Sequence, residues 1–144
     1  NDFWQIAKMV TSGKIKKIKL KKDNLYRVVV TAASKGYPVD YSKVTGKRIF
    51  GLEPFIHQST FSSHPDPELI EGEGSNIHIF GAGVKSSGGK FTAQGGRLFY
   101  VMAAGKNVVE VREKAYNALS KIKIEGNNLH FRTDIGYRDL ERTL

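Results

Sequence analysis

Two apolar runs constrain the fold of this chain more than any other feature of its sequence. The first, YRVVVTAA, occupies Tyr26–Ala33 and is rich in β-branched residues, and the second occupies Leu98–Ala103. Residues of this kind favour strands, and a shorter run at Ile77–Phe80 has the same character. We therefore expect a sheet to form the framework of the fold.

Helical patterns stand on both sides of the strand-rich region. Asp2 is a suitable N-cap for a short first helix that stops at Gly13, and its apolar residues share one face: Phe3, Ile6, Ala7 and Val10. Asn107 is a suitable N-cap for a longer helix. One face of that helix is apolar, with Val108, Val111, Ala115, Leu119 and Ile122, and the other is mostly charged, with Glu110, Arg112, Glu113 and Lys114.

A lysine-rich tract, KIKKIKLKK, follows the first helix at Lys14–Lys22. Ile18 and Leu20 alternate with lysines, which predicts a strand with one buried face and a charged outer face. A nucleic-acid-binding stripe is the alternative, but the tract has no interleaved aromatic residue on which a base could stack.

The order of these elements indicates an α+β fold, as a single domain with a mostly antiparallel, barrel-like sheet and two main helices. A length of 144 residues is usual for one domain. We expect residues 1–24 to form a lead-in helix and strand, and residues 25–144 to form the main domain. Gly36-Tyr37-Pro38 predicts a fixed turn, SSGGK a hairpin bend, and residues 53–75 an irregular region.

Composition excludes several classes of protein. The chain has no cysteine, so disulfides and thiolate metal sites are absent, and no apolar stretch approaches the roughly 20 residues that span a bilayer. The N-terminus has no signal-peptide pattern, and we expect a cytoplasmic protein. It also has no initiator methionine, which indicates either a piece of a longer chain or a processed or trimmed one.

The chain has a formal net charge of +9, which attracts phosphorylated ligands and polyanions. A solvated lysine-rich surface would have the same composition. The charge therefore leaves open both a free-standing nucleic-acid-binding module and a protein with no polyanionic partner.

The glycine-rich stretch GAGVKSSGGK does not match known nucleotide-binding patterns. Val84 stands where the Walker loop needs glycine, Phe91 stands where it needs serine or threonine, and Ser86 replaces the third glycine of the dinucleotide fingerprint. Alternation in HPDPE could offer His64, Asp66 and Glu68 to a metal, but a polar surface loop is the simpler interpretation. His78 alternates with two isoleucines and should face the side of its strand opposite to them.

Two glycines directly before an arginine form the best candidate for a ligand site. Gly95 and Gly96 have no side chains to obstruct a ligand, and the planar guanidinium of Arg97 fits two oxygens of a phosphate. Lys85, on the preceding turn, would add a second positive charge if the flanking strands form a hairpin. A tight turn with an exposed arginine is the equally supported alternative.

Several motifs together resemble a known family. The segments GYPVDY, FGAGVK, GGRLFYVMAAG, REKAYNALSKI and FRTDIGYRDL occur in the order and spacing of the C-terminal domain of the phosphoribosylamine–glycine ligase (glycinamide ribonucleotide synthetase) family. The resemblance covers roughly Arg27–Leu140, and the segment before it resembles the lead-in to that domain.

The resemblance implies an ATP-grasp ligase of de novo purine synthesis, which joins glycine to 5-phosphoribosylamine while ATP is hydrolysed. Its ATP and its Mg or Mn ions would be bound by domains that this chain does not include. The chain would then be inactive alone. Its partners would be the N-terminal and ATP-grasp domains of the same enzyme, with neither a membrane nor, as we expect, a nucleic acid involved.

The resemblance also implies roles for particular residues. Lys85 and Arg97, with Gly95 and Gly96, would bind the ribose phosphate of phosphoribosylamine at one wall of the substrate cleft. The family usually has histidine and threonine where this chain has Gly81 and Val84.

Three further features of the sequence have more than one interpretation. Arg132 and Asp134 would pair with one another or with a neighbouring domain, and we favour a structural role over substrate contact. Gly36-Tyr37-Pro38 could also contact another domain. The corresponding domain of a different ATP-grasp ligase is a third interpretation, against which GYP and RTDIG both argue.

Overall fold

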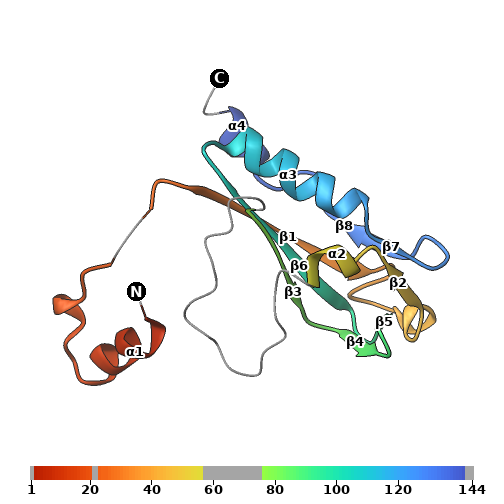
Figure 1. Cartoon of the computed structure of the whole chain (residues 1–144), viewed down its shortest axis with the longest axis horizontal. Coiled ribbons are helices and arrows are strands. Elements are labelled where there is room, and N and C mark those ends of the chain that lie inside the picture. Colours follow the sequence, from red (N-terminus) through yellow and green to blue (C-terminus); the bar gives the residue numbers. More distant parts are fainter. Residues whose placement is uncertain (1, 21–22, 57–75, 142–144) are drawn as a thin grey trace.

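The protein, seen here in a computed structural model, is described over residues 2–20, 23–56 and 76–141. Within those ranges, eight strands form two four-stranded antiparallel sheets (Figure 1). The first sheet has the order β3 (Ile77–Gly81), β6 (Arg97–Gly105), β1 (Tyr26–Ser34) and β8 (Leu129–Phe131). The second has the order β4 (Val84–Ser87), β5 (Lys90–Ala93), β2 (Arg48–Phe50) and β7 (Lys123–Ile124). The predicted α+β fold with antiparallel sheets is confirmed.

One bent hairpin links the two sheets. β3 pairs with β6 in the first sheet, and β4 pairs with β5 in the second, so the same two stretches of chain stay paired through the bend. The turn of the hairpin uses Gly88 and Gly89, which both have positive φ, between the paired Ser87 and Lys90. Glycine adopts that backbone conformation at little cost, so the bend predicted from SSGGK is confirmed.

A single core lies between the first sheet, the second sheet and helix α3 (Val108–Ser120). α3 packs across β6 and β1, and its buried positions face the sheet. Because alternate residues of a strand face opposite sides, Val28, Val30 and Ala32 of β1 point into this core while Val29 is exposed. Burial of these apolar side chains is the main source of stability.

The cap predicted for the long helix is confirmed. Asn107 is extended, and its side-chain oxygen accepts a hydrogen bond from the backbone N–H of Glu110 at 2.9 Å. The helix ends at Ser120, two residues before Ile122, which is the last residue of the apolar pattern. Ile122 is still buried, but it stands in the connection to β7, where it contributes to the core.

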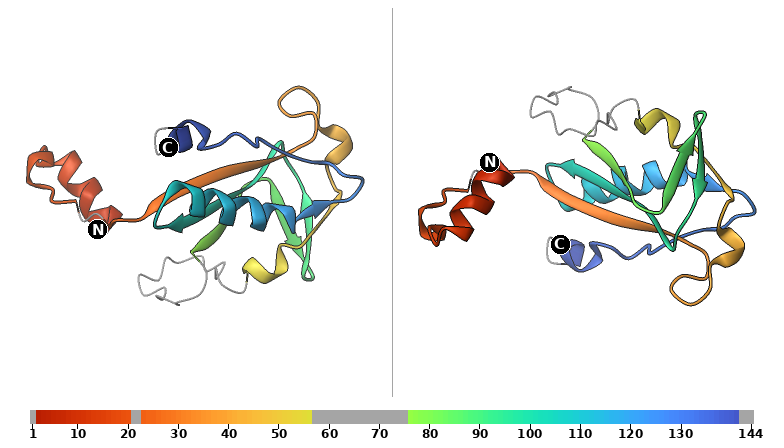
Figure 2. Two further views of the ribbon diagram at one scale, coloured as in Figure 1. Left: turned by 90° about the horizontal axis from the view of Figure 1, so that it is seen from above. Right: turned by 90° about the horizontal axis from the view of Figure 1, so that it is seen from below.

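The remaining helices are short. Helix α1 (Phe3–Thr11) stands apart from the sheets, as both views of Figure 2 show, and the 3₁₀ turn η1 (Ile15–Lys17) follows it. The loop that begins with a cis Tyr37-Pro38 bond contains the 3₁₀ turn η2 (Ser42–Val44), so the predicted turn is confirmed. Helix α2 (Glu53–Ile56) begins the region predicted to be irregular, and α4 (Tyr137–Glu141) lies near the C-terminus.

The strand predicted within Lys14–Lys22 is wrong for the residues that the structure describes, 14–20. Ile15–Lys17 forms η1 instead, and Leu20 is 60 % exposed. The hydrogen bonds there are local: Lys17 N–H donates to the Lys14 carbonyl and Ile18 N–H to the Ile15 carbonyl. A strand needs a partner that supplies a ladder of hydrogen bonds, and none of the described strands extends beside this tract.

Candidate functional site

The candidate site lies where the bent hairpin passes from one sheet to the other. Gly83 is at the inside of this bend: its N–H donates to the Arg97 carbonyl at 3.0 Å, and its own carbonyl accepts from Gln94 N–H at 2.7 Å. A Cβ at Gly83 would lie 2.6 Å from the Arg97 carbonyl oxygen and 2.9 Å from the Gly95 Cα. The two backbones approach closely only because both positions are glycine.

Gly96 is glycine for a different reason. A Cβ there would lie 2.2 Å from Cδ2 of Tyr37 and 3.1 Å from Cε1 of Tyr41, so the tyrosine rings of the GYP loop cover it. The buried Ser34 holds the pair from below: its hydroxyl donates to the Gly95 carbonyl at 2.8 Å, and its N–H donates to the Gly96 carbonyl at 2.7 Å. Neither glycine has positive φ, so close packing, rather than an unusual backbone conformation, requires them.

A change of register points Arg97 outward. β1 and β6 pair regularly as far as Ala32 and Phe99, and then the register shifts so that Ala33 faces Arg97. Cross-strand partners share a face, and Ala32 and Ala33 point to opposite faces. Arg97 therefore leaves the core face that Phe99 occupies, and its side chain is exposed.

Lys85 also points away from the interior. Its neighbours Val84 and Ser86 line a small apolar cavity of about 70 Å³ between the sheets, together with Gly81 and Phe99. By strand alternation Lys85 is on the other face, where it pairs across β5 with Thr92 and is exposed. The two departures from the family pattern, Gly81 and Val84, thus line an apolar cavity beneath the position of Lys85.

The four predicted site residues therefore belong to one bend of the chain. β4 and β5 form the hairpin on which the Lys85 prediction depended, and Arg97 begins the strand that follows. Within the described part of the chain, neither cation forms a side-chain hydrogen bond or an ion pair, so both are available to an anion. Phosphate binding by Lys85, Arg97, Gly95 and Gly96 stays a prediction.

Arg132 and Asp134 pair with one another on the surface. Arg132 Nε donates to Asp134 Oδ1 at 2.8 Å, and this charge-assisted bond lowers the pKa of the Asp134 carboxyl. The same loop is tied to α3, because the Arg112 guanidinium donates to the carbonyls of Thr133 and Ile135, and the Tyr116 hydroxyl donates to the Arg132 carbonyl. These contacts agree with the structural role favoured for the pair.

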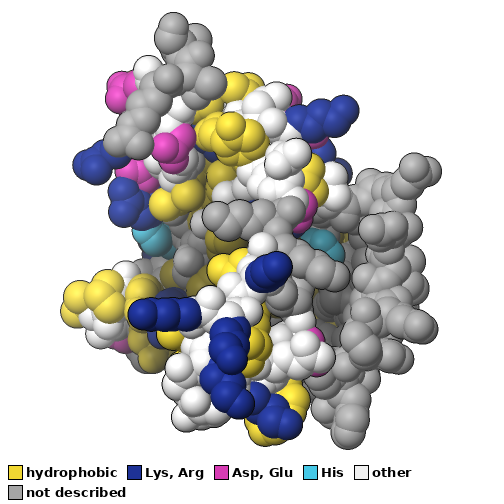
Figure 3. Space-filling view, turned by 90° about the vertical axis from the view of Figure 1, so that its left-hand side faces the viewer, with side chains coloured by type: hydrophobic (Ala, Val, Ile, Leu, Met, Phe, Trp, Pro, Cys, Tyr) yellow, Lys and Arg dark blue, Asp and Glu magenta, His cyan; other side chains and the backbone are white. Residues whose placement is uncertain are grey.

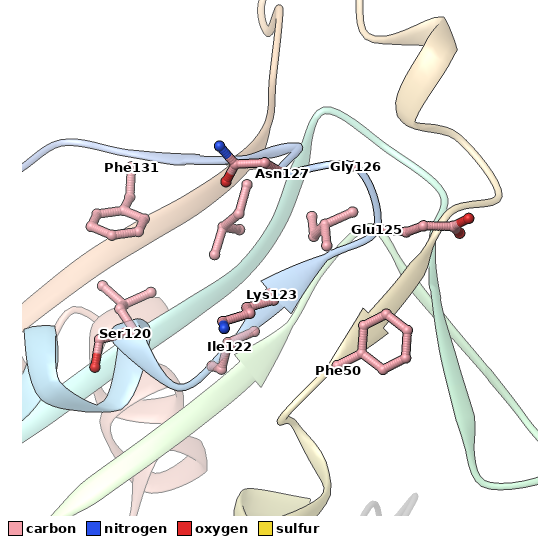
Figure 4. A pocket seen from close by; sticks show the side chains of 11 residues that line it. Phe50, Ser120, Ile122, Lys123, Glu125, Gly126, Asn127 and Phe131 are labelled. Atoms are coloured by element: carbon pink, nitrogen blue, oxygen red, sulfur yellow. The ribbon is translucent and has the colours of Figure 1, made fainter.

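Sequence reasoning missed an open groove between the edge strands β7 and β8. It has a volume of about 560 Å³, and Figure 4 shows Phe50 and Phe131 towards its two ends with Lys123 between them. Its lining is mostly apolar, and Ser120, Lys123, Glu125 and Asn127 add polar or charged groups. A two-residue strand such as β7 has no periodic pattern, so the sequence offered no signal for this groove.

The described residues hold no cluster of three His, Asp or Glu side chains that would suit a metal ion. His78 is exposed and lies opposite the half-buried isoleucines beside it, as its alternation predicted. The candidate ligands His64, Asp66 and Glu68 lie outside the described residues. Within the same ranges, no helix has the length and apolar character needed to cross a bilayer.

The arrangement defines a class: an α+β domain of two antiparallel sheets on one core, with exposed cations where a hairpin bends between them. The sequence pattern of the phosphoribosylglycinamide synthetase C domain matches residues 27–138. The chain belongs to this family.

Two of the similar proteins carry the name phosphoribosylamine–glycine ligase, and a third carries another name. The chain is 35 % identical over 134 residues to the phosphoribosylamine–glycine ligase of Caldanaerobacter subterraneus. The aligned region covers 93 % of this chain and 27 % of that ligase. It is 31 % identical over 144 residues to the ligase of Haemophilus influenzae, covering 100 % of this chain and 29 % of that one. A bovine relative, the trifunctional purine biosynthetic protein adenosine-3, is 30 % identical over 96 % of the chain and 12 % of that protein.

A solved structure resembles the fold. The phosphoribosylamine–glycine ligase of Thermotoga maritima superposes with a TM-score of 0.60 at 26 % identity, over 92 % of this chain and 27 % of that one. The chain thus spans less than a third of the length of the ligases that it matches.

Proposed function

We propose that this chain is the C-terminal part of a phosphoribosylamine–glycine ligase and forms one wall of its substrate cleft. The complete enzyme joins glycine to 5-phosphoribosylamine with hydrolysis of ATP in purine biosynthesis, in the cytoplasm. As the resemblance to the family implies, ATP and a divalent metal belong to the preceding domains. The chain therefore does not catalyse the reaction alone.

The observation that carries this proposal is the pair of exposed cations at the bend of the hairpin. Lys85 and Arg97 have no anionic partner among the described side chains, although the Arg132 guanidinium, also on the surface, is paired. A guanidinium offers two parallel donors to a phosphate, and an ammonium adds a point charge. Both residues bind the 5-phosphate of phosphoribosylamine.

Binding at the phosphate serves the reaction at a distance. The phosphate takes no part in forming the amide bond, but anchoring it fixes the sugar and so positions the amine for attack on an activated glycine. Binding energy from a remote group then contributes to the rate, because the amine no longer has to find its orientation. A preformed corner of close-packed glycines and tyrosines would hold the cations at the rim of the cleft.

The test uses a complete enzyme in which this chain replaces the matching C-terminal part of the Caldanaerobacter ligase. Arg97→Ala should raise KM for phosphoribosylamine by about 10-fold or more, as expected for loss of a hydrogen bond to a charged group. Lys90→Ala removes an exposed lysine of the same hairpin and is the matched control, with KM unchanged. An Arg97→Ala enzyme with an unaltered KM would reject the phosphate site.

Nucleic-acid binding is the alternative function, and a second measurement tests it. Contacts to a phosphate backbone weaken steeply with salt, so titration of the chain with a generic oligonucleotide at two salt concentrations separates the two functions. The proposal expects no tight, salt-sensitive complex.

A further inference from the structure

The open groove between β7 and β8 arises because these two consecutive strands join different sheets. β8 is an edge strand of the first sheet and β7 is an edge strand of the second, and they do not pair with one another. β3 and β4, between which the hairpin bends, lie at the opposite edges of the same two sheets. The groove is therefore a separate place from the candidate phosphate site.

The two ends of the groove differ in chemistry. At one end Phe131 is half-buried, and its ring packs against that of Tyr116 with 6.2 Å between the ring centres, so a fixed aromatic face lines the groove. At the other end the Arg48 guanidinium lies 4.8 Å from the centre of the Phe50 ring, and it does not itself line the groove. One end thus suits a planar ring, and the other is bordered by positive charge.

Two polar side chains in the groove have no partner in the described part of the chain. The Lys123 ammonium forms no ion pair, and the Asn127 amide forms no hydrogen bond. Figure 4 shows both side chains extending towards the end marked by Phe131, whereas Glu125 extends the other way. An ammonium suits an anion, and an amide places an acceptor beside a donor, as the edge of a nucleobase requires.

Lys47 adds a second positive charge at the rim. It is half-buried, and its Nζ lies 3.9 Å from the position that a Cβ would take at Gly126, which lines the groove. No carboxylate of the described residues forms an ion pair with it. Among the described residues that line the groove, Glu125 has the only carboxylate, which accepts a hydrogen bond from the Arg48 N–H at 3.5 Å. The surroundings of the groove are therefore positive on balance.

Positive charge alone does not distinguish this groove. Lys and Arg side chains also gather in the lower part of the face that Figure 3 shows, as expected for a chain with a net charge of +9. The groove combines such charge with an aromatic wall and a free amide. Its volume of about 560 Å³ lies within the usual range for small-molecule sites, about 300–1,000 Å³.

We propose that the groove between β7 and β8 binds a nucleoside phosphate. The base stacks on Phe131 with its edge towards Asn127, and the phosphate lies at Lys123, on the side of Lys47 and Arg48. Because Phe50 and Phe131 stand towards the two ends, the groove accommodates a single free nucleotide rather than a nucleic acid strand. This site goes beyond the proposed function and does not depend on it.

Equilibrium dialysis of labelled AMP against the 144-residue chain, which has a core of its own, tests this site. AMP should bind saturably and at least about 10-fold more tightly than adenosine or inorganic phosphate, because only AMP engages both ends of the groove. Lys123→Gln should weaken AMP binding by about 10-fold or more, as expected for loss of a hydrogen bond to a charged group. Lys121→Gln, at an exposed lysine that does not line the groove, is the matched control and should bind AMP unchanged.

A second variant tests the amide without disturbing the turn. Asn127 has a φ of 55°, which glycine adopts readily, so Asn127→Gly keeps the backbone conformation and removes the side chain. Its affinity for AMP should fall at least about 3-fold, while its amide NMR spectrum away from the groove stays that of the unchanged chain. Equal AMP affinity in Lys123→Gln, Asn127→Gly and the unchanged chain would overturn the proposal, as would the absence of saturable binding.

Two further measurements identify the place and the source of the nucleotide. Arg97→Ala should leave AMP binding unchanged; if it abolishes binding while Lys123→Gln retains it, AMP occupies the hairpin bend and this inference fails. A short oligodeoxyadenylate that binds more tightly than AMP would assign the groove to nucleic acid and also overturn it. Neither result concerns the dependence of KM on Arg97 in the chimeric enzyme, so the proposed function is tested separately.

Discussion

Phe99 and Phe3 have the same side chain but lie in two regions of the molecule that bury it to very different extents. Phe99 is 1 % exposed in the core of the body, which comprises residues 26–56 and 76–141, whereas Phe3 lies on the open face of the N-terminal segment, residues 2–20. The body has one continuous core shared by two sheets and α3. The segment has a capped helix and local hydrogen bonds, but none of its helical residues is buried.

The difference shows that an amphipathic pattern does not identify its own partner. The apolar face of α3 finds its partner in β1 and β6 of the same chain. The apolar face of α1 follows an equally clear pattern, but none of the residues of α1 is buried in the described part of the chain. If the body folds as one cooperative unit to which the N-terminal segment adds little, matched substitutions in the two regions should have unequal effects on stability.

The largest effect should come from truncating the core phenylalanine. Phe99→Ala should lower the free energy of unfolding by about 3–5 kcal/mol, because it removes buried surface and leaves a cavity. Phe3→Ala should change it by no more than about 0.5 kcal/mol, since an exposed side chain loses few contacts. Urea unfolding of the two variants measures both values, and similar losses would mean that the segment packs on the body in the isolated chain.

A smaller effect is expected at the two helix caps. Asn107→Ala should lower the free energy of unfolding by about 1 kcal/mol, because it leaves the Glu110 N–H without its acceptor at the start of α3. Asp2→Ala removes the corresponding bond to Trp4 N–H in α1 and should reduce helical circular dichroism while the unfolding midpoint stays constant. A midpoint that falls equally for both variants would contradict the separation of the two regions.

Local signals predicted much of the body. The strand runs in β1, β3 and β6, the glycines of the β4–β5 turn and the Asn107 cap each depend on residues a few positions apart, and the structure contains all of them. The strand predicted from the lysine tract was wrong, because alternation leads to a strand only where a partner strand is present. The sequence of the tract does not show whether such a partner strand exists. The two-residue strand β7 could not be predicted from the sequence, because it forms a strand only through its pairing with β2.

The candidate site was predicted only in part. The sequence identified Arg97 and its paired glycines, but it explained the glycines by access for a ligand. In the structure Gly96 is required by the ring of Tyr37, and Gly95 by the approach of Gly83. Nor could the sequence reveal the register shift that points Arg97 outward, because that shift depends on the pairing of β6 with β1. Close approaches between distant segments leave no local pattern.

The smallest expected effect lies at the junction of the two regions. Asp23, just before β1, accepts hydrogen bonds from both terminal nitrogens of Arg27, at 2.8 and 2.6 Å, and one from Leu25 N–H. These bonds favour the ionised carboxylate and lower the pKa of Asp23 from 3.8 to about 2. Since the pKa is lower in the folded state, the pair stabilises the fold above about pH 4, and this contribution is lost as the pH falls towards 2.

An NMR titration of the Asp23 carboxyl measures this directly. Its pKa should be about 2 in the unchanged chain and return close to 3.8 in Arg27→Gln, whereas Arg138→Gln, at an exposed arginine of α4, should leave it low. The pair is exposed, so its effect on the free energy of unfolding should be small and should weaken further in salt. If Asp23 titrates near 3.8 in the unchanged chain, the junction is not held to β1. The boundary between the folded body and the N-terminal segment would then lie at Tyr26, where the strand begins.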